Sequence, residues 1–206
     1  MRSGILANNL TLSKLQEEVL VGLVLGDGCL YRQQKSHNAR LLVGQSLKQA
    51  DFLVWLYEIF KDFVRTPPRS KIRQRAGKQN FEMGFKTLSH CTFTKFYDLF
   101  YAPKKIIPEN INELLTPIAF AVWFMCDGSI KSKECKGRIL NTQSFIRSDI
   151  DRLIIILNKK FRLKASIRMQ KDGLQIYISA KSAKILDDLL RDRILPSFNY
   201  KLPFKI

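Results

Sequence analysis

Two apolar runs in the sequence end in the same dipeptide, Asp-Gly. The first run covers residues 20–26 and stops at Asp27, and the second covers residues 120–126 and stops at Asp127. Both runs are apolar on all sides, which is typical of helices buried in a core. Each is far shorter than the roughly 18 apolar residues that a membrane-spanning helix needs, so we expect no membrane span. The pattern predicts two buried helices with the same polar end.

The same order of elements follows each Asp-Gly. Strand-like stretches come first, then an amphipathic helix, then a hairpin with alternating apolar and polar residues, then a short helix. In the first copy these elements are expected at residues 29–35, at a second strand ending in 44–46, and at 49–63, 71–86 and 94–101. In the second copy they are expected at residues 129–133, at a second strand ending in 142–144, and at 148–161, 165–179 and 182–191. The sequence therefore predicts an α+β protein made of two pseudo-symmetric αββαββα repeats.

Prolines mark the boundary between the repeats. Pro103 and Pro108 lie in a short stretch without apolar periodicity, and proline commonly interrupts regular elements. We expect a first repeat at residues 1–102, a linker at 103–112 and a second repeat at 113–206. Each repeat has roughly the length of a small domain.

The charge balance points to a polyanionic partner. The chain has 206 residues, with 35 Lys and Arg against 18 Asp and Glu, which gives a formal net charge of +17. Its 46% hydrophobic content is enough for a core, so the chain is not a disordered basic tail. A nucleic acid is the expected partner; a membrane surface is not, because no basic amphipathic helix of membrane type is present. A phosphate-binding loop of the GxxxxGK[ST] type is also missing from the sequence, which argues against nucleotide hydrolysis.

The two aspartates are candidates for a metal site. Each stands where a helix exposes carbonyls and partial negative charge, so a carboxylate there needs compensation. Gly22 and Gly26 would let the two helices approach closely, and the converging oxygens would then suit Mg²⁺. The plain alternative is that Asp-Gly is an ordinary helix stop followed by a turn.

These residues also carry a family resemblance. Leu20, Gly22, Leu23, Asp27 and Gly28 in the first run, and Ala121, Asp127 and Gly128 in the second, resemble the LAGLIDADG motif. Val122 and Cys126 stand where the motif has glycine and alanine. With its two motifs in one chain, the sequence resembles the single-chain LAGLIDADG homing endonucleases from about Leu15 to its end.

The resemblance implies an intron-encoded endonuclease that depends on Mg²⁺. Its two antiparallel sheets would form a saddle over duplex DNA, with the motif helices packed at the centre. Two or three divalent ions would be shared between Asp27 and Asp127, with the backbone of Gly26 and Cys126 as further ligands, and each aspartate would cleave one strand. The implied catalytic residues are Asp27, Asp127, Lys105, Lys201, Gln45 and Gln143. In a chain this basic, the alternative for each lysine is a solvated surface position.

One face of the predicted sheets is rich in residues that can read DNA. In the second hairpin Ile167, Met169, Leu174, Ile176 and Ile178 are expected to face the helices, which turns the polar positions outward. Arg, Lys and Gln on a two-stranded ribbon can contact base edges or phosphates, although an ordinary solvated sheet face is the alternative. The candidate DNA contacts are Tyr31, Gln33, Lys35, Arg40, Lys71, Arg73, Arg75, Lys131, Lys133, Arg138, Arg168, Gln170, Gln175 and Tyr177.

The expected activity is a double-strand break in a long asymmetric DNA site, made by a monomer, because outward residues differ between the repeats. The alternative is a maturase of the same fold that binds its host intron RNA. A DNA-binding regulator of this fold is a third class, but no helix-turn-helix module is evident. We expect an intracellular protein, in an organelle or a prokaryotic cytoplasm, because the N-terminus resembles neither a signal nor a transit peptide.

Overall fold

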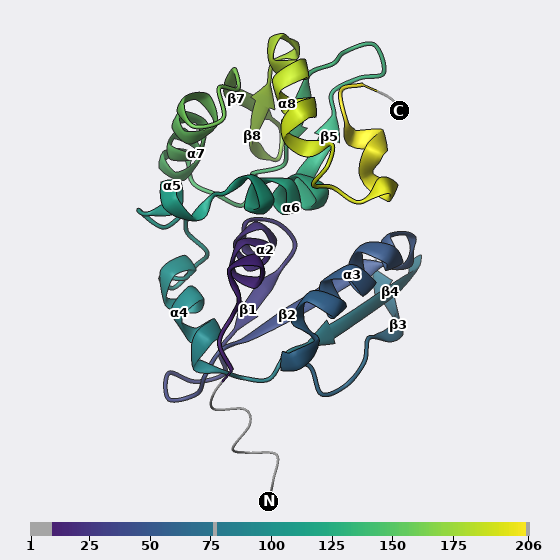
Figure 1. Ribbon diagram of the computed structural model, residues 1–206, viewed down its shortest axis with the longest axis vertical. Helices are drawn as coiled ribbons and strands as arrows, with labels where there is room; N and C mark the ends of the chain where they lie inside the picture. The colour runs from purple at the N-terminus through teal and green to yellow at the C-terminus, as the bar shows by residue number, and fades with distance from the viewer. Residues whose placement is uncertain (1–9, 76–77, 205–206) are drawn as a thin grey trace, which may run out of the picture. The chain divides into compact units, whose positions relative to one another are not determined.

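The computed structural model describes residues 10–75 and 78–204 (Figure 1). Four side chains in this range, those of Arg73, Arg75, Lys78 and Asn80, are not described. The chain forms two compact units. The first holds the described residues up to Glu17 together with Asp27–Leu99, and the second holds Glu18–Gly26 and the chain from Phe100 onward. Most of the first motif helix is therefore part of the second unit.

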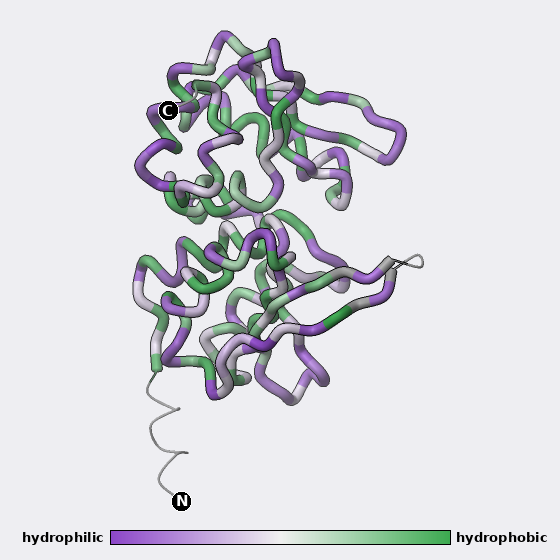
Figure 2. The backbone as a smooth tube through the Cα atoms, turned by 90° about the vertical axis from the view of Figure 1, so that its right-hand side faces the viewer, coloured by the Kyte–Doolittle hydropathy of each residue, from purple (hydrophilic) through white to green (hydrophobic). Residues whose placement is uncertain are grey.

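The first unit is built on a four-stranded antiparallel sheet. Its strands follow the order β1–β2–β4–β3, and they are β1 (Cys29–Tyr31), β2 (Arg40–Ser46), β3 (Arg69–Arg75) and β4 (Lys78–Lys86). Helix α3 (Ala50–Phe60) lies across one face of the sheet (Figure 1) and buries Phe52, Leu53, Leu56 and Phe60. The short helices η1 (Leu47–Gln49) and η2 (Lys61–Phe63) flank α3, and α4 (Cys91–Phe100) follows the sheet. The hairpin of β3 and β4 projects from the rest of its unit (Figure 2).

The second unit repeats this plan. Its antiparallel sheet has the order β5–β6–β8–β7. The strands are β5 (Gly128–Ile130), β6 (Arg138–Leu140), β7 (Ala165–Gln170) and β8 (Gly173–Ile178). Its helices are α5 (Ile111–Leu114), α6 (Pro117–Asp127), α7 (Arg147–Lys159), η3 (Ala180–Ser182), α8 (Ala183–Leu190) and η4 (Pro196–Lys201). The predicted α+β class with two matching repeats is confirmed.

The two motif helices pack closely through glycines. In α2 (Lys14–Leu25) and the residue after it, a Cβ added at Gly22 would lie 2.4 Å from the carbonyl oxygen of Ala119 and 2.6 Å from the Cβ of Val122. A Cβ added at Gly26 would lie 2.4 Å from the Cβ of Cys126. The larger residues of α6 therefore fit against glycines of the first motif run. This explains how α6 can carry Val122 and Cys126 where the motif has small residues.

The first strand of each sheet is shorter than predicted. The ladder stops at Tyr31, paired with Arg40, in the first sheet and at Ile130, paired with Arg138, in the second. The residues that follow are polar and have no core to face, so burial does not extend the strands. The candidate contacts Gln33, Lys35, Lys131 and Lys133 consequently lie on loops.

The expectation that Met169 faces the helices is wrong. Its side chain is 73% exposed, whereas Ile176 and Ile178 are buried as predicted. Met169 pairs with Leu174, one step before the final pair of the β7–β8 hairpin, Gln170 with Gly173. The strand alternation is kept, but close to the hairpin turn the Met169 side chain is exposed to solvent. In the described part of the chain, no helix combines the length and apolar character needed to cross a bilayer.

Candidate active site and nucleic-acid interface

Asp127 ends α6 and is held by residues of its own unit. The indole N–H of Trp123, one helical turn earlier, donates to Asp127 Oδ2 at 3.1 Å. The backbone N–H and the side-chain amide of Asn141 both donate to the Asp127 carbonyl at 3.1 Å. The carboxylate is half-buried, and its Oδ2 lies 3.5 Å from the position that a Cβ on Gly26 would take. The end of the first motif run thus lies beside the Asp127 carboxylate.

A buried lysine interacts with the carbonyl end of α6. Lys201, on η4, is only 6% exposed. Its Nζ donates to the carbonyl of Met125 at 2.6 Å and to that of Cys126 at 3.4 Å, the two carbonyls that precede Asp127. It also lies 5.1 Å from the centre of the Phe198 ring. An ammonium at this place offsets the partial negative charge of the helix end.

Lys105 does the same for the first motif run. Its Nζ donates to the carbonyl of Gly26 at 3.0 Å and lies 5.6 Å from the centre of the Phe145 ring. A β-bridge between Tyr101 and Lys105 fixes the main chain there. Both predicted lysines therefore lie where an Asp-Gly helix ends, which is not a solvated surface position.

Asp27 lies in the first unit, where its carboxylate is exposed. The side-chain amide of Gln45, a buried residue of β2, donates to Asp27 Oδ2 at 3.3 Å. Asp27 and Gln45 line a hollow of about 1070 Å³ on the open face of the first sheet. Basic residues, among them Arg69, Lys71 and Lys86, also line it. The hollow joins the aspartate to a basic sheet face.

Gln143 is not the structural counterpart of Gln45. Cys29 and Ser129 each stand two residues after the aspartate of their repeat. Cys29 pairs with Leu42, and Ser129 pairs with Ile139. A position in β2 therefore corresponds to the position 97 higher in the second repeat. Gln45 therefore corresponds to Thr142, which is buried and donates to the carbonyl of Leu174 at 2.9 Å. The Gln143 amide instead donates to Asp172 Oδ2 at 3.2 Å. The Gln-Ser letters of the two repeats are thus offset by one residue from the strand register, and Gln143 lies in the turn that follows β6.

The expectations for Arg138 and Gln175 as outward readers of DNA are contradicted. Arg138 is 4% exposed and corresponds to Leu41, a core position of the first sheet. Burial lowers the pKa of its guanidinium, and the charges of Cys135 and Asp187 act in the opposite direction. Gln175 is buried as well, and its amide donates to Asn141 Oδ1 at 2.8 Å. Neither side chain has a surface to offer to DNA.

In the first unit the remaining candidates lie on strands and on one loop. Tyr31 and Lys71 are exposed, and the guanidinium of Arg40 lies 5.4 Å from the centre of the Tyr31 ring. Gln33 and Lys35 are exposed on the loop between β1 and β2. The side chains of Arg73 and Arg75 lie outside the described residues.

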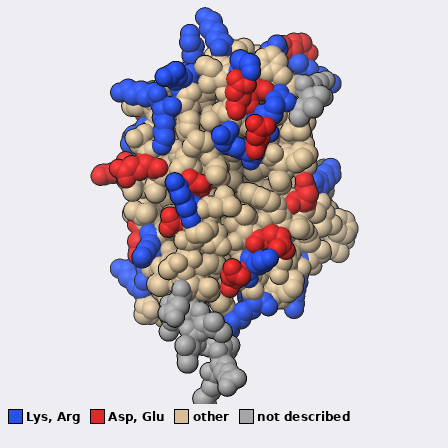
Figure 3. Space-filling model, viewed as in Figure 1, with Lys and Arg blue, Asp and Glu red and all other residues tan. Residues whose placement is uncertain are grey.

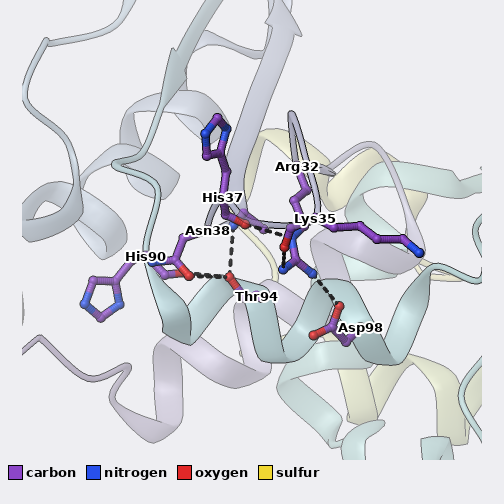
Figure 4. Close-up of polar contacts among 8 residues, drawn as sticks. Arg32, Lys35, His37, Asn38, His90, Thr94 and Asp98 are labelled. Carbon is purple, nitrogen blue, oxygen red and sulfur yellow. Dashed lines mark hydrogen bonds and ion pairs between the residues drawn. The ribbon is translucent and has the colours of Figure 1, made fainter.

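Arg32 holds this loop against α4 (Figure 4). Its guanidinium donates to the carbonyl of His37 at 2.7 Å, to the carbonyl of Lys35, and to Asp98 Oδ1 of α4 at 3.0 Å. The hydroxyl of Thr94 donates to Asn38 Oδ1 at 3.1 Å. Lys35 points away from these contacts (Figure 4), so the loop presents its ammonium from a fixed backbone.

In the second unit the candidates cluster around Tyr177. Lys131 Nζ lies 4.9 Å from the centre of the half-buried Tyr177 ring, and Lys133 is exposed on the same loop. On this loop the backbone N–H of Gly137 lowers the pKa of the Cys135 thiol. Arg168, half-buried on β7, donates to Gln175 Oε1 at 3.1 Å. Gln170 is half-buried near the hairpin turn.

At least one face of the molecule carries both basic and acidic side chains. On the face shown in Figure 3, acidic side chains lie among the lysines and arginines. On α8, Lys184 forms an ion pair with Asp188, and Asp187 pairs at 2.5 Å with Nη2 of Arg191, the residue after the helix. The exposed pair of Lys184 and Asp188 neutralises charge locally and adds little stability, whereas Asp187 is buried beside Arg191.

The donor set around the aspartates fits a hard divalent cation. Within residues 10–75 and 78–204, no three His, Cys, Asp or Glu side chains form a ready metal cage. In the second unit Asp127 supplies a carboxylate, and the carbonyls of Gly26 and Cys126, which also accept from lysines, lie close by. In the first unit Asp27 supplies a carboxylate of its own. A carbonyl oxygen has two lone pairs, so such a hydrogen bond leaves one for a metal. Mg²⁺ commonly takes few protein carboxylates and fills its shell with water and substrate phosphate.

Three residues in these sites were not predicted from the sequence. Trp123 lies four residues before Asp127 on the same helix face, so helical spacing could have identified it. Asn141 could have been found only from the strand register, since it follows β6 at the place of Gly44. No sequence pattern identifies Arg32, because its partners on the loop are backbone carbonyls.

Comparison with known proteins reveals relatives along nearly the whole chain. Residues 17–186 match the model of the LAGLIDADG DNA endonuclease family. The chain is 32% identical over 203 residues to the probable intron-encoded endonuclease 1 of Wickerhamomyces canadensis, a match that covers 95% of this chain and 87% of that protein. It is 26% identical to the cytochrome b mRNA maturase bI2 of Debaryomyces hansenii, over 98% of this chain and 78% of that protein.

Solved structures match the fold. The homing endonuclease I-WcaI, solved bound to its DNA recognition sequence, superposes with a TM-score of 0.89 at 30% identity and covers 96% of this chain and 89% of its own. I-DmoI, solved in complex with DNA and Mn, superposes with a TM-score of 0.53 at 16% identity, over 85% of this chain and 96% of its own. The second match concerns the fold alone.

Proposed function

Because the chain belongs to the LAGLIDADG DNA endonuclease family, we propose that it is a homing endonuclease that makes a double-strand break in a long, asymmetric DNA site by metal-dependent phosphodiester hydrolysis. The observation that carries the proposal is that, at the end of each motif run, a lysine ammonium binds the backbone carbonyls just before an aspartate. Lys105 donates to Gly26, the residue before Asp27, and Lys201 donates to Met125 and Cys126, just before Asp127.

Asp27 and Asp127 would hold divalent cations, for which Mg²⁺ is our choice. When bound, such an ion lowers the pKa of a water ligand and neutralises charge that develops on the phosphate. Trp123 fixes the orientation of the Asp127 carboxylate through Oδ2, and Gln45 does so for Asp27. The two lysines offset the partial negative charge of the carbonyls that precede each aspartate, which reduces the repulsion that an anionic substrate would meet there.

Duplex DNA is the proposed substrate. In the first unit, the exposed Tyr31, Gln33, Lys35 and Lys71 would supply contacts, together with Arg40, Arg73 and Arg75. In the second unit Lys131, Lys133, Arg168, Gln170 and Tyr177 would do so. The net charge of +17 supports strong phosphate binding. I-WcaI was solved with its DNA recognition sequence, which supports the same partner here.

The organisation of the chain supports action as a monomer. One chain carries both Asp-Gly helix ends, so a second copy is not needed to provide two carboxylates. The names of relatives include the term intron-encoded. This supports a gene that lies within an intron and a protein that acts in the compartment that holds this intron. The domain boundaries at residues 102 and 112 stay a prediction.

A second candidate function is RNA maturation. It is favoured by the relative named cytochrome b mRNA maturase bI2, which matches 98% of this chain. The two functions share the basic surface, but a protein that only binds RNA has no need for carboxylates beside phosphates. The maturase alternative therefore predicts that both aspartates can be replaced without loss of RNA maturation.

The test is incubation of the protein with a library of randomised DNA duplexes in Mg²⁺, followed by sequencing of the cut ends. We expect one asymmetric site with a fixed overhang, no cutting in EDTA, and binding with little turnover in Ca²⁺. If about eight phosphates are neutralised, log affinity should fall against log salt with a slope near −7. Cutting that persists in EDTA, or cut ends without any sequence preference, would overturn the proposal.

A further inference from the structure

Arg138 joins two segments of the second unit that are far apart in sequence. Its guanidinium donates to the carbonyl of Cys135 at 3.1 Å and to that of Gly137 at 2.9 Å, both on the loop between β5 and β6. It also donates to the carbonyl of Lys201 at 2.5 Å and to that of Leu202. A planar guanidinium has five N–H donors in a fixed fork, so these contacts set the two backbones against each other.

The loop that Arg138 holds carries candidate DNA contacts. Lys131 and Lys133 are exposed on it, and Lys131 lies over the ring of Tyr177. Gly137 packs so closely on this ring that an added Cβ would lie 2.6 Å from the Tyr177 hydroxyl. The loop is therefore fixed from inside by Arg138 and leaves its lysines on the surface.

The other segment carries Lys201. The Lys201 side chain reaches the carbonyls of Met125 and Cys126 from the main-chain position that Arg138 holds. A lysine has a flexible four-carbon stem, so the place of its ammonium depends on where its backbone is fixed. Removing the hydrogen bond at the Lys201 carbonyl should loosen the ammonium next to Asp127.

At the matching position of the first sheet there is no arginine. The residue that corresponds to Arg138 is Leu41, which is buried and apolar. Lys105 is fixed by its bridge to Tyr101 instead. An arginine link between a loop and a lysine is thus a property of the second half.

We propose that Arg138 is a positioning residue for Lys201 and that it makes cleavage of the strand served by Asp127 depend on the loop between β5 and β6. This inference rests on the proposed function. It predicts an asymmetry that neither the family nor the repeated fold requires. The two strands of one target should respond differently to changes at Arg138.

The test measures both strands in one reaction. A duplex target labelled on each strand is cut by excess protein in a single turnover, and Asp127→Asn identifies the strand that Asp127 serves. Arg138→Lys keeps the charge but not the fork, and Arg138→Leu copies the first half. Both variants should slow the Asp127 strand about 10-fold or more, as expected when charge-assisted hydrogen bonds are lost. The other strand should change less than about threefold. Equal slowing of both strands, or of neither, would overturn the inference.

Arg191→Leu is the matched control. Arg191 also holds the C-terminal segment, through the Phe204 carbonyl at 3.1 Å and Asp187 Oδ2 at 2.7 Å, but beyond Lys201. It should leave the ratio of the two strand rates unchanged. If it shifts that ratio as much as the Arg138 variants do, general loosening of the segment is the cause and the positioning role of Arg138 is wrong.

Lys133→Ala changes an exposed side chain of the loop and leaves the interior unchanged. It therefore still tests the dependence of Asp127-strand cleavage on the loop if the Arg138 variants do not fold. At saturating protein it should slow the Asp127 strand more than the other strand, and an equal effect on both would overturn the link to the loop. A wild-type protein that cuts neither strand would contradict the proposed function. A wild type that cuts both strands while the variants show no strand bias contradicts the role of Arg138 alone.

Discussion

The two sheets have the same strand order but different residues at their centres. In the first sheet Gly44 lies opposite Gly84, and a Cβ added at Gly44 would meet nothing within 4 Å. At the matching place in the second repeat, Asn141 accepts a hydrogen bond from Gln175. The first sheet is hollow where the second is filled by amides. The two sheets share their strand order, whereas the side chains on their surfaces differ in chemistry.

The aspartates show the same contrast. Asp27 accepts from Gln45, a residue of the neighbouring strand, whereas Asp127 accepts from Trp123, a residue of its own helix. The first carboxylate is exposed and the second is half-buried. Two sites with different supports should respond differently to mutation and to metal. Each half therefore has to be tested separately, strand by strand.

The largest expected effect comes from removing either carboxylate. Asp27→Asn and Asp127→Asn should each slow one strand by at least about 100-fold, because a metal ion contributes several kcal/mol to such a reaction. Binding should stay near the wild-type level, since neither change removes a basic group. The measurement is the rate for each labelled strand together with a binding curve in Ca²⁺.

Each aspartate variant should leave a nick in a different strand. If both variants lose the same strand, the two halves do not divide the work. Full double-strand cleavage by both variants would contradict the assignment of the aspartates.

The glycines separate a packed position from an open one. Gly26→Ala places a Cβ 2.4 Å from the Cβ of Cys126 and should destabilise the protein by about 1–3 kcal/mol, as overpacking does. Gly44→Ala meets open space and should be neutral or stabilising by up to about 1 kcal/mol. Urea unfolding measures both.

The double variant Gly26→Ala with Cys126→Gly provides the control. It exchanges the sizes across the contact and should recover part of the lost stability. No recovery would mean that the clash lies elsewhere.

A smaller effect is expected from the residues that orient the carboxylates. Trp123→Phe keeps the ring and removes the N–H donor, and it should slow the Asp127 strand about 10-fold. Gln45→Leu should slow the Asp27 strand by less, because its acceptor is exposed to water. Strand-specific rates as a function of Mg²⁺ concentration check both changes. An equal loss on both strands would indicate a packing defect in place of orientation.

The helices and the two repeats could be predicted from the sequence because they depend on periodicity. Amphipathic spacing identified α3 and α7, and the alternation of residues identified both hairpins. The glycines at Gly22 and Gly26 also indicated the close helix contact, which depends only on side-chain size. Strand ends were missed, since polar residues alone do not show where a ladder stops.

The interior polar residues could not be placed from the sequence. Arg138 looks like a surface residue by type, and only the strand register shows that it takes a core position. The Gln-Ser letters at Gln143 repeat those at Gln45, but the strand register places Thr142 at the position that corresponds to Gln45. Hydrogen bonds from side chains to carbonyls, such as those of Lys105 and Lys201, join distant segments and have no local pattern.

The grouping of Glu18–Gly26 with the second unit affects how the gene can be divided. A fragment that starts at the linker lacks the first motif run, in which Gly22 packs against Val122 and Gly26 packs against Cys126. Its α6 would then expose an apolar side that is normally covered. Chimeras that exchange whole halves at the linker should therefore aggregate unless the first motif helix is matched to the second unit.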